Sequence, residues 1–320
     1  ELRVRAFADG ARPGPVAAAV FTLVAPELRE FSSDLPVFVV STAGDAIRPK
    51  SFVDAHLTTF EPRESGRASL AGLWGAEGGE RAFDLSMPAG IKTRGSSTLE
   101  RPEKSYGLEV RDETGRDSPA ALGGLPPDAD WVLYAPHNFD QSHLRNALCY
   151  ELATRMGLSA PRTRFVELFV HGGEGPLRPD DYVGLYLLVE RISPGRHRVD
   201  VEELEPKHDR EPAITGGDIR KVDRRGPGES GFVAGGQEMQ YFYPKERHIT
   251  DPQRRWLVQY FDGLGSVMNA IHFDDEDLGY AGWIDVDNWV DFHLFNEYTK
   301  NPDAYTLSTY FHKRRGGKLR

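Results

Sequence analysis

Short runs of apolar and β-branched residues, separated by turn residues, dominate the first half of the chain. Residues 35–41 (LPVFVVS) form a nearly continuous apolar run with the length of a buried strand. Strand patterns follow at 51–59, 82–87, 90–94, 105–110, 131–134, 164–170 and 182–190. Because the loops between these segments are mostly short, the pattern predicts a largely antiparallel, strongly twisted sheet.

A separate hairpin is expected before this sheet. Residues 1–10 alternate apolar and polar side chains and end at Asp9-Gly10, and residues 20–24 can form the returning strand. Two strands alone do not hold a core. The segment is similar to the end of small β-sandwich domains appended to many secreted bacterial enzymes. We therefore interpret residues 1–26 as the last hairpin of a preceding β-sandwich.

Helical spacing of apolar residues appears once in the first half and dominates the second. Residues 140–157 carry leucines four apart, with Asp140 or Ser142 as an N-cap and Gly157 as a C-terminal stop. Residues 251–271 and 287–299 have apolar and aromatic residues at helical spacing. The stretch 216–236 is expected to be an exposed loop with one strand at 218–223.

This distribution predicts an α+β, two-lobed architecture with a sheet-rich N-terminal lobe and a helix-rich C-terminal lobe. Ligands bind preferentially in clefts between such lobes.

Charge and composition argue against several classes of protein. The 320 residues carry a formal net charge of -10, which argues against a general nucleic-acid binder, because neutralising phosphates requires surplus Lys and Arg. The acidity favours basic partners. No run of about 18 apolar residues could span a membrane. The single cysteine, Cys149, excludes a disulfide within the chain, and no zinc-type Cys/His spacing occurs.

Two segments could bind an anion or a nucleotide. In residues 90–110 a strand runs into Arg94-Gly95-Ser96-Ser97, and a basic loop then leads to Lys104. Glycine and hydroxyl residues allow backbone N–H groups to approach an anion, but a solvated basic hairpin has the same composition. In residues 181–192 an apolar strand ends at Glu190, as expected of a kinase hinge strand or of an ordinary core strand.

A third segment could carry out catalysis. Asn301 and Asp303 lie on a predicted loop after an aromatic helix, with Pro302 fixing the turn. An aspartate there can position a hydroxyl nucleophile or accept its proton, and an asparagine beside it can hold phosphate-bound Mg²⁺. Asn-Pro-Asp is also ordinary turn chemistry.

In combination these segments resemble the CotH (spore coat protein H-like) family of atypical protein kinases. RGSSTLERPEKSYGLEV is similar to that family's RGNSS and PKKSY signature. The other similar segments, in chain order, are the start of the 140–157 helix, PRTRFVELFVHG, YVGLYLLVERI, GGDIRKV, Tyr243-Pro244-Lys245, Asn301–Asp303 and YFHK. The resemblance extends over residues 35–320, which it identifies as one CotH-like kinase domain.

The resemblance implies ATP-dependent phosphorylation of protein Ser/Thr hydroxyls, with ATP and Mg²⁺ or Mn²⁺ as cofactors. Lys104 would contact the α- and β-phosphates, and Arg94 with the Gly95, Ser96 and Ser97 turn would lie near the phosphates. Glu151 would be the carboxylate partner of the lysine.

The remaining roles fall on later segments. The strand from Tyr186 to Glu190 would line the adenine pocket. Asp303 would be the catalytic aspartate and Asn301 its support. The resemblance also implies a secreted or cell-surface bacterial protein, of the kind found in spore coats, that acts on a protein substrate, including basic ones.

Three departures accompany the resemblance. Ser96 stands where the family has asparagine, and Glu103 replaces one cation. The WD-x-D metal-binding motif of the family is expected beyond Arg320, so the metal aspartate is not assigned to this segment. A non-catalytic surface or coat protein with a kinase-like scaffold is the alternative function.

Overall fold

The computed structural model describes residues 2–5, 16–19, 22–71, 83–136, 140–226 and 228–320. Contacts divide the chain into two compact units, each described by itself below. The first, the barrel unit, comprises Glu1–Tyr150 and Pro161–Arg191, and the second, the sheet unit, comprises Glu151–Ala160 and Ile192–Arg320.

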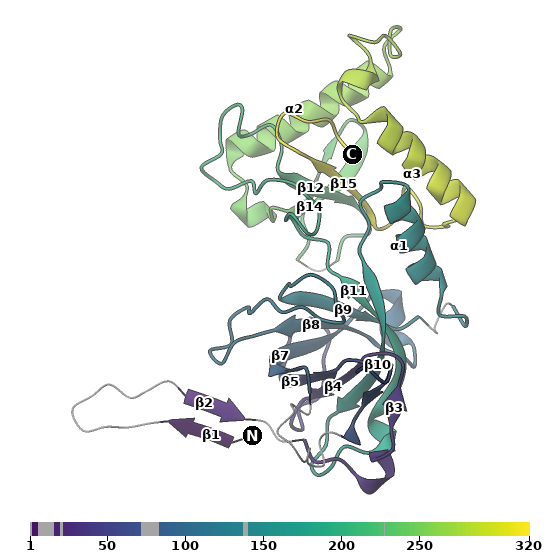
Figure 1. The fold of residues 1–320 in the computed structure, drawn as a ribbon. Coiled ribbons are helices and arrows are strands. Elements are labelled where there is room, and N and C mark those ends of the chain that lie inside the picture. The colour runs from purple at the N-terminus through teal and green to yellow at the C-terminus, as the bar shows by residue number, and fades with distance from the viewer. Residues whose placement is uncertain (1, 6–15, 20–21, 72–82, 137–139, 227) are drawn as a thin grey trace, which may run out of the picture. The chain divides into compact units, whose positions relative to one another are not determined.

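The main element of the barrel unit is a closed barrel of seven strands (Figure 1). In spatial order they are β10 (Thr163–His171), β11 (Tyr182–Glu190), β9 (Asp130–Tyr134), β8 (Ser105–Val110), β7 (Leu85–Arg94), β5 (Val53–Phe60) and β4 (Val37–Ser41). Neighbouring strands are antiparallel except β4 and β10, whose parallel pairing closes the barrel. Closure leaves no free edge in this sheet.

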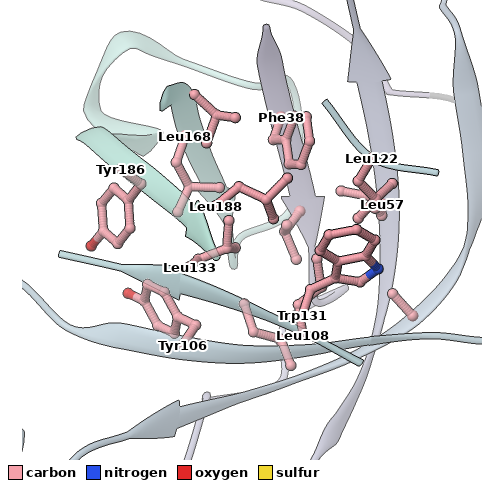
Figure 2. Packing of buried hydrophobic residues seen from close by; sticks show 14 of the residues in the cluster. Phe38, Leu57, Tyr106, Leu108, Leu122, Trp131, Leu133, Leu168, Tyr186 and Leu188 are labelled. Atoms are coloured by element: carbon pink, nitrogen blue, oxygen red, sulfur yellow. The ribbon is translucent and has the colours of Figure 1, made fainter. Parts of the chain in front are cut away.

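Large apolar side chains fill the barrel, as Figure 2 shows. Because successive residues of a strand point to opposite faces, every second residue enters this interior. Trp131, Leu133, Tyr186 and Leu188 point inward, and the buried cluster that they join contains only apolar and aromatic side chains. On the outer face Val132, Leu187 and Val189 form a separate apolar cluster. That cluster packs against residues of the helix that follows β9.

Smaller elements complete this unit. Strands β1 (Leu2–Arg5) and β2 (Val16–Ala19) form an antiparallel hairpin, and β3 (Ser32–Ser33) pairs with β6 (Ala68–Ser69). The short 3-10 turns of this unit are η1 (Pro26–Leu28), η3 (Ser97–Glu100) and η4 (Pro179–Asp181). A second apolar cluster packs Val24, Leu28 and Leu177 against the outer side of β4 and β10.

Helix α1 (Arg145–Arg155) spans the boundary between the units. The Asp140 carboxylate accepts hydrogen bonds from the backbone N–H groups of Ser142 (3.0 Å) and Arg145 (2.6 Å), which satisfies donors at the helix start. Gly157 follows the helix at φ 82°. The helix therefore begins five residues after the expected start at Asp140, whereas Gly157 is confirmed as its C-terminal stop.

The sheet unit contains a four-stranded antiparallel sheet in the order β13 (Gly231–Ala234), β14 (Gln237–Tyr243), β12 (Asp218–Val222) and β15 (Thr309–Lys313). Its helices are α2 (Asp251–Met268) and α3 (Val286–Thr299), with 3-10 turns η5 (Glu246–His248) and η6 (Tyr280–Gly282). A reciprocal pair of hydrogen bonds between Thr250 and Gln253 caps α2. Asp285 caps α3.

The interior of the sheet unit combines an apolar cluster with buried charges. Residues of β12, β14 and α2 form the apolar part. Beside it, Asp218, Arg220 and Lys313 are buried, and the Arg220 side chain is 0% exposed. Arg220 Nε lies 3.2 Å from Asp218 Oδ2, and Lys313 Nζ donates to the Thr215 carbonyl at 2.6 Å.

Most elements read from the sequence are present, and several boundaries are corrected. The chain is α+β as expected, but a helix-rich second half is not confirmed, because α2 and α3 share this unit with a four-stranded sheet. The strands expected at 82–87 and 90–94 are one strand, β7. The loop expected at 216–236 contains a second strand, β13. The strand that returns along β1 is β2 at 16–19 rather than the expected 20–24, since residues 22–24 do not pair with β1. The Asp9-Gly10 turn and residues 20–21 lie outside the described residues.

Candidate active site

The Gly95 turn directly follows β7. Gly95 has φ 121°, a conformation that favours glycine, and a Cβ there would collide with the Thr98 hydroxyl. The 3-10 turn η3 begins two residues later. Arg94 and Ser96 are exposed, so the turn presents backbone and charge to solvent. Only the backbone of Ser97 is described. A glycine-specific turn beside a cation is a suitable binding element for an anion.

Lys104 closes this turn from its other end. Its ammonium donates hydrogen bonds to the carbonyl oxygens of Leu99 (2.6 Å) and Arg101. Its own carbonyl accepts a bond from the Tyr186 hydroxyl at 2.8 Å. Lys104 therefore connects the turn to the barrel wall through both its side chain and its backbone.

Strand β11 presents its two predicted residues to the protein interior. The Tyr186 ring lies in the barrel core and stacks with Tyr106 at a centroid distance of 6.0 Å (Figure 2). Burial raises the pKa of Tyr186 well above its usual range. The Glu190 carboxylate is buried and binds Arg162, with Oε1 at 2.7 Å from Nη2 and Oε2 accepting from the backbone N–H at 3.0 Å. The outward side chains Leu187 and Val189 are buried too, in the apolar cluster that packs against α1.

Glu151 lies on helix α1 and is exposed. Its Oε1 pairs with Arg155 Nε at 2.7 Å, one helical turn later. Pairs of this kind contribute about 0.3–0.5 kcal/mol. The expected pairing of Glu151 with Lys104 stays a prediction, because the two residues belong to different units.

The loop after α3 carries the proposed catalytic pair. Lys300 ends the helix in the left-handed conformation (φ 50°), and Asn301 and Asp303 follow. The Asn301 amide nitrogen donates to Asn296 Oδ1 at 2.9 Å, and its Oδ1 accepts from the backbone N–H of Asp303 at 3.2 Å. The Asp303 carbonyl accepts hydrogen bonds from the backbone N–H groups of Thr306 and Leu307, so the loop folds around Asp303. The Asp303 side chain is exposed.

Asn296 was not singled out by the sequence argument. It is buried in the last turn of α3, where its Nδ2 also donates to the Phe292 carbonyl at 2.8 Å. A buried amide normally needs such partners, because an unpaired one costs about 1–3 kcal/mol. The available signal was the polar Asn296 within an otherwise aromatic helix face.

The far end of the same loop is tied to β12. The Ser308 hydroxyl lies 3.3 Å from Asp223 Oδ2, and Lys221 Nζ lies 3.4 Å from the same oxygen. Lys221 also pairs with Glu229 at 3.2 Å. These side chains hold the loop immediately before β15 begins. Neither Asp223 nor Ser308 was singled out from the sequence as a site residue.

The structure thus builds two groups of predicted residues rather than one. Within the barrel unit, Lys104, Tyr186 and the Gly95 turn are directly connected, and Glu190 ends the same β11 strand. Within the sheet unit, Asn301 and Asp303 form one loop. Each group lies within a single unit.

The chemistry of Asn301 and Asp303 fits part of a Mg²⁺ site. Mg²⁺ takes oxygen ligands and is usually held by one or two carboxylates together with substrate phosphates. One exposed carboxylate and one amide oxygen on the same loop are such donors. Among the described residues, no group of three or more His, Cys, Asp or Glu side chains could hold a metal ion. In the same part of the chain, no helix is long and apolar enough to span a bilayer.

The fold and these loops define an α+β protein with a barrel unit, a sheet unit and an exposed aspartate on an anchored loop. The sequence model of the CotH kinase protein family matches residues 91–320, and the chain belongs to this family. None of the curated proteins matches the chain.

Proposed function

We propose that this chain carries the ATP-binding and catalytic region of an atypical protein kinase that phosphorylates Ser/Thr hydroxyls of proteins. Membership of the CotH kinase family supports a kinase-like function. The observation that carries the proposal is the Asn301–Asp303 loop, which presents the exposed Asp303 carboxylate. Hydrogen bonds of Asn301 hold the loop backbone to α3, and Ser308 bonds to Asp223, the residue after β12.

In the proposed reaction Asp303 accepts the proton of the substrate hydroxyl. The hydroxyl oxygen forms a bond to the γ-phosphorus of ATP while the bond from that phosphorus to the β,γ-bridging oxygen breaks, releasing ADP. Catalysis of this step depends mainly on positioning and electrostatic stabilisation. Bound Mg²⁺ would neutralise developing phosphate charge, and the amide oxygen of Asn301 would supply one ligand to it.

The barrel unit would hold the nucleotide. The Gly95 turn can bring backbone N–H groups close to phosphates, and Arg94 adds charge at its start. A secreted or cell-surface bacterial location is part of the same proposal.

The test compares Asp303→Asn with Asp274→Asn in the longest natural polypeptide that contains this chain. Asp274 is an exposed residue of an acidic turn, so the control removes the same charge. With Mg²⁺ and γ-labelled ATP, we expect the unchanged protein and Asp274→Asn to label a basic Ser/Thr-rich substrate. Asp303→Asn should lose about a hundredfold or more in kcat, the range of general-base contributions. Equal labelling by all three proteins would sink the proposal, as would the absence of labelling together with no thermal stabilisation by ATP. The second result would favour a non-catalytic scaffold.

A further inference from the structure

Lys92 lies on the outer face of the barrel. It is on β7 between Ile91, which points into the barrel, and Thr93, so its own side chain points outward. Its register partner on β8 is Gly107, and a Cβ at Gly107 would lie 3.4 Å from Lys92 Cε. The glycine thus leaves room for the lysine stem to lie across β8.

The ammonium of Lys92 is near carboxylates that other cations already occupy. Asp130 pairs with Arg191 at 2.6 Å, and Glu109 pairs with Arg111 at 2.8 Å. Among the described residues, Lys92 has no carboxylate within ion-pair distance. Its contact is the face of the Phe52 ring, 4.2 Å from Nζ.

The electrostatics of this position are unfavourable for an isolated cation. Burial lowers the pKa of Lys92, and the charges of Arg191 and Arg94 lower it further. Arg94 is two residues along the same strand and therefore on the same face. The carboxylates of Asp130 and Glu109 raise this pKa, but both are already paired with arginines. Among the described residues Lys92 therefore has no ion-pair partner of its own, which a phosphate group would supply.

Lys104, unlike Lys92, already has hydrogen-bond partners for its ammonium. Its ammonium already donates to two carbonyl oxygens of the Gly95 turn, and its backbone is bound to Tyr186. Moving it to a phosphate would break those bonds and leave the carbonyls without their donor.

We propose that Lys92 is the lysine that contacts the nucleotide phosphates, together with Arg94, and that Lys104 is a positioning residue that holds the Gly95 turn. This inference rests on the proposed function, because it assigns the nucleotide site of that function to the outer face of β7 and β8. It reverses the role that family resemblance gives to Lys104.

An acyl-phosphate derivative of ATP tests the assignment directly. The neutral amine of a lysine near the phosphates attacks the acyl carbon, the bond from that carbon to the phosphate oxygen breaks, and ATP leaves. One proton is lost when the ammonium becomes the neutral amine and a second when its nitrogen becomes the amide, and both pass to solvent. A lysine with a lowered pKa supplies more neutral amine at a given pH, which favours the reaction.

The acylated lysine is located by mass spectrometry with and without excess ATP, and ATP binding is measured in parallel by thermal shift. We expect ATP-protected acylation of Lys92. Acylation of Lys104 alone, or ATP binding without protected acylation of Lys92, overturns the inference and leaves the proposed function intact. Absence of both ATP binding and protected labelling instead contradicts the proposed function and the inference with it.

Variants give a second, independent readout. Lys92→Met should weaken ATP binding about ten- to hundredfold, the range of a hydrogen bond to a charged group, while Lys92→Arg should retain most of the affinity. The thermal midpoint of Lys92→Met should stay equal or rise, because an unpaired, partly buried charge is removed. Lys104→Met should lower the midpoint. Lys318→Met removes an exposed cation and serves as the control. Unchanged ATP affinity in folded Lys92→Met would also overturn the inference.

Discussion

The two units of the chain are stabilised by different interiors. The inside of the barrel is packed with apolar and aromatic side chains, and its buried Glu190 lies at the end of β11. The sheet unit instead buries Asp218, Arg220 and Lys313 directly beside its apolar cluster. Apolar burial is non-directional, but buried charges need exact partners. The barrel is therefore suited to be a scaffold whose outer face can vary. The sheet unit fixes a specific geometry for β12 and β15, the strands that frame the Asp303 loop.

The largest effect is expected from emptying the barrel core. Trp131 is almost fully buried, and its indole N–H donates to the Asp128 carbonyl at 2.9 Å. Trp131→Ala should destabilise the barrel unit by about 5 kcal/mol, since it leaves a large cavity. Denaturant unfolding followed by circular dichroism measures this. Trp131→Phe should lose clearly less, and equal losses in both variants would contradict a packing role.

Breaking the buried ion pair should have the next largest effect. Asp218→Ala leaves the Arg220 guanidinium buried without its carboxylate, which should cost about 4 kcal/mol. Burial raises the pKa of Asp218 and lowers that of Arg220, so the two groups depend on each other for their charges. The double variant Asp218→Leu/Arg220→Met should recover most of the stability. A double variant as unstable as Asp218→Ala would show that the charges matter for something other than their pairing.

The sheet unit should also be the acid-sensitive one. Burial lowers the pKa of His312 to about 4, and the Arg320 charge lowers it further. Because this folded-state pKa is below the usual 6.5, the unfolded chain binds more protons between pH 6.5 and 4. Stability is therefore complete above pH 6.5 and is lost as the pH falls towards 4, by about 3 kcal/mol at most.

Comparison of the unfolding free energy at several pH values with that of His312→Gln isolates this contribution. The difference between the two proteins should change across the pH window. If it stays constant between pH 7 and 4, His312 is not the responsible group.

Local sequence patterns predicted individual strands of the barrel, but not how the barrel closes, and they missed one strand of the sheet unit. Strands β8 and β11 were predicted to the residue. Apolar residues alternate along β8, and β11 is a nearly continuous apolar run between Asp181 and Glu190. Barrel closure was not predicted, since the parallel pairing of β4 with β10 joins residues about 130 positions apart and leaves no local pattern. Strand β13 was read as loop because glycines and charged residues surround it.

The candidate site shows the same limit. The Asn301–Asp303 turn was predicted from the sequence, because Asn, Pro and Asp are typical turn residues. Its anchors Asn296 and Asp223 depend on side-chain contacts that turn signals do not encode. Lys104 was assigned to phosphate by resemblance, and only the structure shows its ammonium bound to the carbonyls of the Gly95 turn.

The smallest effect is expected from removing the hydrogen bond between Asn296 and Asn301, which tests whether this bond supports catalysis. If Asn296 acts only by holding the Asn301 amide, Asn296→Ala should lower kcat about tenfold, or about 1.4 kcal/mol, and leave the KM for ATP unchanged. Asn301→Ala should lower kcat more. Adding Asn296→Ala to it should change little, because the interaction is already lost. Losses in kcat that add in the double variant would mean that Asn296 acts by a route other than Asn301. An unchanged kcat with lower stability would mean that Asn296 contributes to folding alone.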